Sequence, residues 1–123
     1  MKGSMSGLMN MWQGTPFPEM IRSLPEIDIP MEGIRGWLLQ SGGMQAVFFD
    51  IEPIGEIPPH SHCAQWGIVL EGEMRLTIGN ESKIRRKGDW YYIQEGVTHG
   101  AEFLTRVNVI DIFDAPDRYK VKD

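Results

Sequence analysis

Cysteine is almost absent from this sequence, which holds a single thiol, Cys63, in 123 residues. One cysteine excludes an intramolecular disulfide framework and indicates a reducing compartment, so we predict a cytoplasmic location. Long apolar runs are also missing, because the first twelve residues, MKGSMSGLMNMW, are too polar for a signal peptide or a membrane span. We therefore expect no membrane partner.

An excess of positive charge is missing as well. The chain has 12 Lys and Arg against 17 Asp and Glu, which gives a net charge of −5. The main basic cluster, at residues 83–87, is typical of a solvated strand end or turn. We expect no nucleic-acid partner.

Long amphipathic helices are the third absence, since 14 glycines and 8 prolines divide the chain into short segments. One helical turn is expected at residues 19–23, and turn signals separate short apolar runs after it. The pattern predicts an all-β fold, a single antiparallel double-sheet barrel of the jelly-roll type. The predicted strands are residues 36–40, 44–51, 60–62, 65–70, 73–78, 81–85, 90–94, 98–103 and 106–113.

The length fits one domain. We expect residues 1–15 to form a flexible N-terminal segment, which is either left from an expression tag or a ragged start with Met9 or Met11 as the natural initiator. Residues 16–113 are expected to form the β-barrel domain. Residues 114–123, DAPDRYKVKD, are predicted to be a loose polar tail with little core.

Only three histidines are present, and their spacing is informative. His60 and His62 leave the same face of an extended strand, where two imidazoles can chelate one metal ion. Gln65 follows closely and can add an amide oxygen, and His99 lies on another predicted strand. We predict one divalent ion per chain, and these ligands suit Fe, Mn, Ni, Zn or Cu. A strand histidine is more often a surface residue, and an H-x-H pair alone is a weak signal.

Two longer segments carry a family resemblance. Residues 55–72, GEIPPHSHCAQWGIVLEG, resemble the first cupin motif, with its H-x-H pair and closing glycine. Residues 88–99, GDWYYIQEGVTH, resemble the second motif, G-x5-P-x-G-x2-H. The resemblance is to small single-domain cupins, and it implies a cupin barrel over residues 16–113.

The chain departs from the family pattern at two positions. Gln65 stands where the family usually has a glutamate, and Gln94 replaces the proline of the second motif. The amide removes a negative charge and a general base from the site. It also leaves a bound metal more electrophilic, with positions open for substrate or dioxygen.

Other residues are weaker candidates. Four aromatic residues are predicted to bind substrate, although aromatics in small barrels are more often core or dimer surface. Alternation turns at most one of Tyr91 and Tyr92 inward. Gly67, inside an apolar run, is expected to leave room above the metal. The predicted substrate-binding residues are Tyr92, Trp90, Trp37 and Phe48.

Three polar or sulfur-bearing residues also stand out. Cys63, beside His62, is expected to be a buried or turn cysteine rather than a ligand. Arg35 and Arg106 are candidates for holding a carboxylate substrate, but most such arginines are solvated.

The resemblance implies several functions, because small cupins include dioxygenases, isomerases, decarboxylases and lyases. Open metal positions favour a metal-dependent, dioxygenase-like oxidoreductase that acts on a small organic substrate. The alternative is a non-enzymatic module that binds or senses a small ligand, and a purely structural metal site is the weakest reading. No catalytic residue is assigned. We expect a homodimer, with the N-terminal segment packing across its interface.

Overall fold

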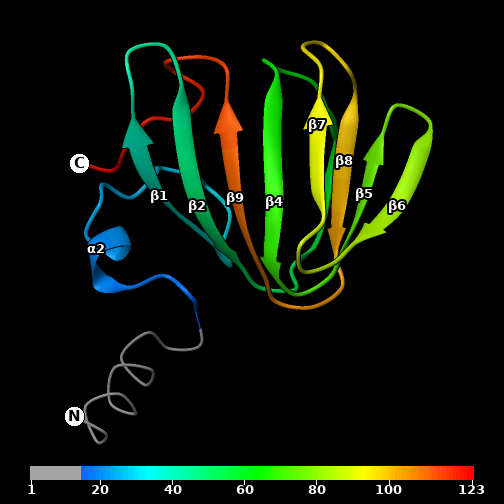
Figure 1. The fold of residues 1–123 in the computed structure, drawn as a ribbon, viewed down its shortest axis with the longest axis horizontal. Coiled ribbons are helices and arrows are strands. Elements are labelled where there is room, and N and C mark those ends of the chain that lie inside the picture. Colours follow the sequence, from blue (N-terminus) through cyan, green and yellow to red (C-terminus); the bar gives the residue numbers. More distant parts are fainter. Residues whose placement is uncertain (1–14) are drawn as a thin grey trace, which may run out of the picture.

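The computed structural model describes residues 15–123, which form one short helix and nine strands (Figure 1). Eight of the nine predicted strands are present, the ninth overlaps β3 only at His60, and the predicted helical turn is α2. Most strand ends lie within two residues of their predicted positions. The elements are α2 (Glu19–Arg22), β1 (Ile34–Gln40), β2 (Gln45–Ile51), β3 (Gly55–His60), β4 (Gln65–Glu71), β5 (Met74–Ile78), β6 (Glu81–Arg85), β7 (Trp90–Ile93), β8 (His99–Phe103) and β9 (Val107–Phe113).

Strand β3 is the exception, because it begins at Gly55 and ends at His60, whereas residues 60–62 were predicted. Pro58 and Pro59 lie inside it, and proline cannot donate a ladder hydrogen bond. The strand tolerates them because it is at the edge of its sheet and its pairing with β8 is irregular between Ile57 and His60. The H-x-H pair of His60 and His62 therefore straddles a strand end.

The strands form two antiparallel sheets, which confirms the predicted all-β, double-sheet fold. One sheet has the order β1-β2-β9-β4-β7 and the other the order β3-β8-β5-β6. Strand β9 lies between β2 and β4 in the first sheet, so it pairs with two strands that are distant from it in the sequence. The last strand of the chain thus lies at the centre of the larger sheet.

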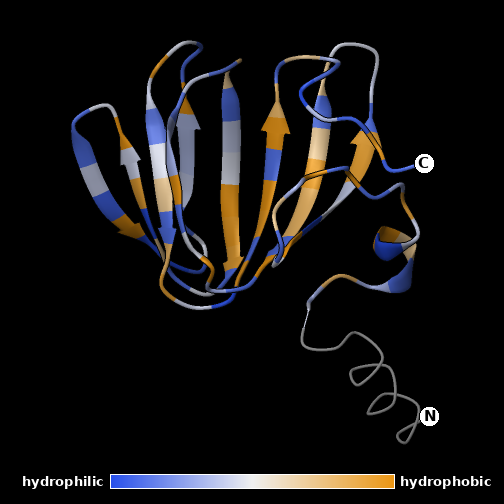
Figure 2. Ribbon diagram, turned by 180° about the vertical axis from the view of Figure 1, so that it is seen from behind, coloured by the Kyte–Doolittle hydropathy of each residue, from blue (hydrophilic) through white to orange (hydrophobic). Residues whose placement is uncertain are grey.

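Alternation along the strands places apolar side chains between the sheets. In β9, Val107, Val109 and Phe113 are buried, and they pack with Val47 and Phe49 of β2. Apolar residues predominate along β1 and β2, whereas β6 is largely polar (Figure 2). The core therefore lies toward the β1–β2–β9 side.

The outer face of the larger sheet is partly covered by the segment before α2. The Phe17 ring packs edge-on against Trp37 at 6.1 Å and against Phe48 at 5.7 Å between ring centroids. Trp37 is 2% exposed as a result. These three rings form a second, smaller apolar layer behind β1 and β2.

The C-terminal residues are packed against the domain, so the prediction of a loose tail is wrong. Tyr119 packs against the core, and its backbone exchanges two hydrogen bonds with the buried Gln45 side chain, at 2.9 and 3.0 Å. Val121 forms a bridge with Ile27. The polar composition of the tail hid this anchoring, because one aromatic ring and backbone hydrogen bonds provide it.

Residues 1–14 lie outside the described part of the chain, so the expectations for the N-terminal segment stay predictions. Among residues 15–123, no helix has the length and apolar character needed to cross a membrane.

Candidate metal centre and cavity

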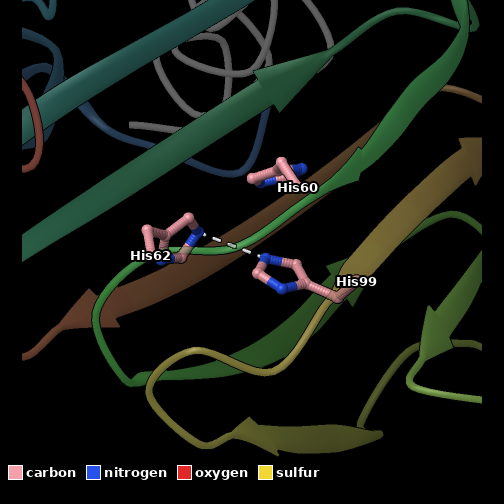
Figure 3. Close-up of side chains that lie close together, drawn as sticks. All are labelled: His60, His62 and His99. Atoms are coloured by element: carbon pink, nitrogen blue, oxygen red, sulfur yellow. Dashed lines mark hydrogen bonds between the residues drawn. The ribbon is translucent and has the colours of Figure 1, made fainter.

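Three histidines, two at strand ends and one in the loop after β3, meet at one end of the smaller sheet. His60 ends β3, His62 follows two residues later, and His99 begins β8, where it pairs with His60. Their candidate ligand nitrogens all lie within 4.8 Å of one another, and Figure 3 shows the three rings close together. The structure thus brings together the three histidines that the sequence predicted.

The remaining nitrogen of each ring is held by the backbone. The Nδ1 atoms of His60, His62 and His99 lie 2.9, 2.8 and 3.0 Å from the carbonyl oxygens of Pro58, Cys63 and Val97. A carbonyl only accepts, so each Nδ1 carries the proton and donates it. In the neutral ring, Nε2 is then left with a free lone pair, which is the tautomer that binds a metal.

The distance between two of the lone pairs fits a shared ion. The Nε2 atoms of His62 and His99 lie 3.2 Å apart. Two nitrogens bound to one ion at about 2.0–2.1 Å, at angles between octahedral and tetrahedral, are separated by roughly 2.8–3.4 Å. In neutral rings two such lone pairs repel each other, and a cation between them removes that repulsion. The donor set therefore fits a divalent metal.

Electrostatics keeps two of these rings neutral. The pKa of His62 is lowered from 6.5 to about 4, mainly by burial and to a smaller extent by the charge of Arg118, against a raising contribution from the hydrogen bond to the Cys63 carbonyl. Burial also lowers the pKa of His99. Neutral imidazole is the metal-binding form, so the lowered pKa values of both rings favour the form that binds a metal.

Gln65, the predicted fourth ligand, points into the same region from the start of β4. Its amide N–H donates to the Asp111 carboxylate, whereas its Oε1 atom is buried without a hydrogen-bond partner among the described residues. A buried, unsatisfied acceptor is rare and points to a missing ligand. The orientation suits a metal-ligating oxygen, and ligation by Gln65 stays a prediction.

Asp111 and Tyr91 form a buried polar pair that sequence reasoning missed. The Tyr91 hydroxyl donates to Asp111 at 2.7 Å. Burial raises the pKa of Asp111 to about 6, against the lowering effect of the hydrogen bonds from Tyr91 and Gln65. Asp111 alternates with the apolar residues Val107, Val109 and Phe113 on one face of β9, and that pattern was the available signal.

Gly67 makes room for this pair rather than for the metal. A Cβ atom added there would lie 2.1 Å from Asp111 Oδ1 and 2.4 Å from the Tyr91 hydroxyl. Gly67 was expected to leave room above the metal, but the groups that approach its backbone are the buried acid and its tyrosine.

The histidines, Gln65, Tyr91 and Asp111 all line one cavity of about 560 Å³ between the two sheets. Its volume is in the range of small-molecule sites. Apolar side chains from both sheets line it, among them Phe49 of β2, Leu76 of β5 and Val109 of β9, and the C-terminal segment closes part of it. The lining from that segment is Arg118, Tyr119 and Lys120.

None of the four aromatic residues predicted to bind substrate lines this cavity. Tyr92 and Trp90 are 53% and 61% exposed on the outer face of β7, and Trp37 and Phe48 pack against Phe17. The choice of Tyr92 as the inward aromatic was wrong, because β7 turns Tyr91 inward instead. Alternation allowed only one of them, and the sequence did not fix which.

The predicted arginine candidates also lie elsewhere. Arg35 pairs with Glu26 and Arg106 with Asp50, and neither lines the cavity. Cys63 is half-buried, and burial raises the pKa of its thiol. It is not in the group that could hold a metal, which agrees with the prediction for it.

Comparisons with known proteins agree with this architecture. The family model described as "Cupin domain" matches residues 47–113. No curated protein matches the chain.

Solved structures are similar over most of the chain. An RmlC-like cupin from Shewanella frigidimarina is 28% identical, with a TM-score of 0.69, over 85% of this chain and 92% of that one. KdgF from Halomonas sp. is 25% identical, with a TM-score of 0.66, over 75% and 86%. Bacillus subtilis oxalate decarboxylase, studied for its Mn(II) centres, is 20% identical, with a TM-score of 0.65, over 79% of this chain and 29% of that one.

Proposed function

The chain belongs to the cupin domain family, and on that premise we propose that its cavity is the active site of a metal-dependent enzyme acting on a small organic molecule. The observation that carries the proposal is the convergence of three histidine Nε2 lone pairs on a cavity of about 560 Å³. A purely structural site needs no cavity of this size beside the metal.

In this proposal His60, His62 and His99 hold one divalent ion, and Gln65 completes or gates the site through Oε1. Such an ion acts as a Lewis acid and, if it is redox-active, supports chemistry with dioxygen. The protein fixes the three rings through their Nδ1–H bonds to backbone carbonyls. The apolar walls exclude water from the substrate.

We favour an oxidoreductase of the dioxygenase type. The protein ligands are neutral, since the glutamate usual in the family is replaced by Gln65, and neutral ligands leave the ion electrophilic with positions for substrate and dioxygen. A second candidate is an isomerase or lyase. Asp111 favours it, because a carboxyl with a pKa near 6 that faces the cavity can exchange protons near neutral pH.

The first test is the metal content of untagged protein purified without chelator, measured by plasma mass spectrometry. We expect about one Fe, Mn, Ni, Cu or Zn per chain, lost in His62→Ala and kept in the adjacent control Cys63→Ala. If the purified protein holds no metal, each of these ions, Mn(II) included, is added to it and the bound metal is measured again. Failure of the wild-type protein to bind any of them would overturn the proposal.

Oxygen uptake then separates the candidate functions. A redox metal with oxygen uptake in the presence of small dicarbonyl, thiol or phenolic compounds supports the dioxygenase. Substrate conversion without oxygen uptake, abolished by Asp111→Asn, supports the isomerase or lyase. Tight ligand binding without turnover supports the non-enzymatic binding module.

We also propose that the protein is a homodimer through the outer face of the larger sheet. Trp66 lies beside Tyr92 and Ile112 in the register there, and Trp90 on β7 is 61% exposed. Apolar surface on a strand at the sheet edge is typical of an interface. Light scattering of the wild type and Trp90→Glu tests this, with a monomer expected for the variant and a dimer for a Lys83→Glu control.

A further inference from the structure

We propose that the ligand of this cavity carries a carboxylate group and that Arg118 is the residue that binds it. The inference deepens the proposed function and rests on it for the identity of the site. Arg118 lines the cavity from the C-terminal segment, which closes part of it.

Arg118 differs from the other six arginines of the chain in its contacts. Four of them form ion pairs, and Arg22 and Arg85 donate to backbone carbonyls. Within residues 15–123, Arg118 forms no ion pair and no hydrogen bond, and its buried Nε atom is without a partner. The four ion-paired arginines are Arg35, Arg75, Arg86 and Arg106.

Two aromatic rings hold the guanidinium in place. Its Cζ atom lies 4.4 Å from the centre of the Tyr119 ring and 5.8 Å from that of Phe113. Stacking on a ring face leaves the in-plane N–H donors free, in the fork that matches a carboxylate. A buried donor that is left unpaired is costly, so a guanidinium held here without an acceptor points to an acceptor on the ligand.

The guanidinium lies close to the histidines. The Phe113 ring contacts both Tyr119, at 5.4 Å between centroids, and His62, at 5.7 Å. The charge of Arg118 also acts on His62 and His99. One small molecule can therefore reach Arg118 and the metal-binding nitrogens together.

The charges of the cavity wall favour an anion at this end. Lys120 lines the cavity beside Arg118. Of the two acidic residues in the lining, Asp111 is occupied by Tyr91 and Gln65, and Asp28 forms no ion pair with Arg118. Within residues 15–123 no carboxylate forms an ion pair with the guanidinium, which leaves this role to the ligand.

The test compares acids with amides of the same shape. Acetate, malonate, succinate and benzoate, and the matching amides, are titrated into metal-free, 15N-labelled protein while the arginine Nε–H and cavity amide resonances are followed. We expect at least one acid to shift the Arg118 Nε–H signal and to bind at least tenfold more tightly than its amide. Arg118→Gln should weaken that acid at least tenfold.

Two further variants make the result specific. Arg118→Lys keeps the charge but loses the fork, so its affinity should lie between those of the wild type and Arg118→Gln. The matched control is Arg35→Gln, because Arg35 also stacks on a ring, Trp37 at 4.9 Å, but on the outer face. It should bind as the wild type does. Well-dispersed spectra establish that each variant is folded.

The proposal is overturned if no acid binds more tightly than its amide, or if Arg118→Gln binds the acids as well as the wild type does. Metal content, measured on the same preparation before the metal is removed, reports separately on the proposed function. A metal-free native protein that still binds acids through Arg118 would refute the metal centre and leave the carboxylate site standing.

Discussion

The Tyr91 hydroxyl donates a 2.7 Å hydrogen bond to Asp111 across the backbone of Gly67. The three residues lie on three neighbouring strands, β7, β9 and β4, so the contact ties together the half of the larger sheet that carries Gln65. Because Gln65 donates to the same carboxylate, the pair also fixes which way its amide faces.

Replacement of Gly67 by alanine should strongly destabilise the protein. The new Cβ would lie 2.1 Å from Asp111 Oδ1 and 2.4 Å from the Tyr91 ring, so both buried side chains must move. We expect a loss of about 2–4 kcal/mol in urea unfolding, typical of overpacking combined with a broken buried hydrogen bond. Gly42→Ala is the control, since nothing lies within 4 Å of its added Cβ, and an equal loss there would contradict this account.

Removal of the Tyr91 hydroxyl should cost less than the Gly67 substitution. Tyr91→Phe takes one hydrogen bond from a buried carboxylate, and we expect a loss of about 1–3 kcal/mol at pH 7. Tyr92→Phe, one residue along β7 with an exposed side chain, should change stability by less than about 0.5 kcal/mol. Equal effects in the two variants would show that the bond to Asp111 contributes nothing.

The pH dependence of stability should carry the signature of Asp111. Its pKa is raised from 3.8 to about 6, so the folded state holds the proton more tightly than the unfolded state does. That contribution is complete below pH 3.8 and is lost as the pH rises through 6. Between pH 4 and pH 7, Asp111→Asn should therefore gain up to about 3 kcal/mol relative to the wild type.

The histidines act in the opposite direction but do not obscure this comparison. The lowered pKa of His62 gives stability that is present above pH 6.5 and lost as the pH falls toward 4. This contribution is common to the wild type and Asp111→Asn, so it cancels in the difference. A difference in unfolding free energy that stays constant with pH would contradict the assigned pKa of Asp111.

The fold and three of the proposed ligands could be predicted from the sequence because local signals fix them. Turn residues and β-rich runs set the strands, and the spacing of His60, His62 and His99 within two motifs predicted the site. What could not be predicted depends on contacts distant in the sequence. Tyr91 and Asp111 are 20 residues apart, and Arg118 lines the cavity from a C-terminal segment that hydrogen-bonds to Gln45, 74 residues before Tyr119.

Metal binding should raise the thermal stability of the protein in a concentration-dependent way. An ion that binds only the folded state stabilises it by about 2.7 kcal/mol at a hundredfold excess over Kd. We expect the melting temperature to rise with added Mn(II) or Zn(II) in the wild type and in Cys63→Ala. His99→Ala, which loses one of the three converging nitrogens, should show little or no rise. A full rise in this variant would place the ion elsewhere.

The anchoring of the C-terminal segment should depend on Gln45. This side chain is 2% exposed, and it pairs with both the N–H and the carbonyl of Tyr119. Gln45→Leu keeps the volume but leaves both backbone groups without partners, which should cost about 2–4 kcal/mol. Hydrogen exchange at the Tyr119 amide should become faster.

The same variant links the anchor to ligand binding. If Tyr119 holds the Arg118 guanidinium in place, Gln45→Leu should also weaken carboxylate binding, although Gln45 is not part of the cavity wall. Gln94→Leu, at an exposed position in the turn after β7, is the control and should change neither property. Faster exchange at Tyr119 with unchanged carboxylate affinity would mean that Arg118 needs no support from the anchored tail. Faster exchange at Tyr119 together with weaker carboxylate binding would show that the closure of the cavity depends on Gln45, a residue of β2.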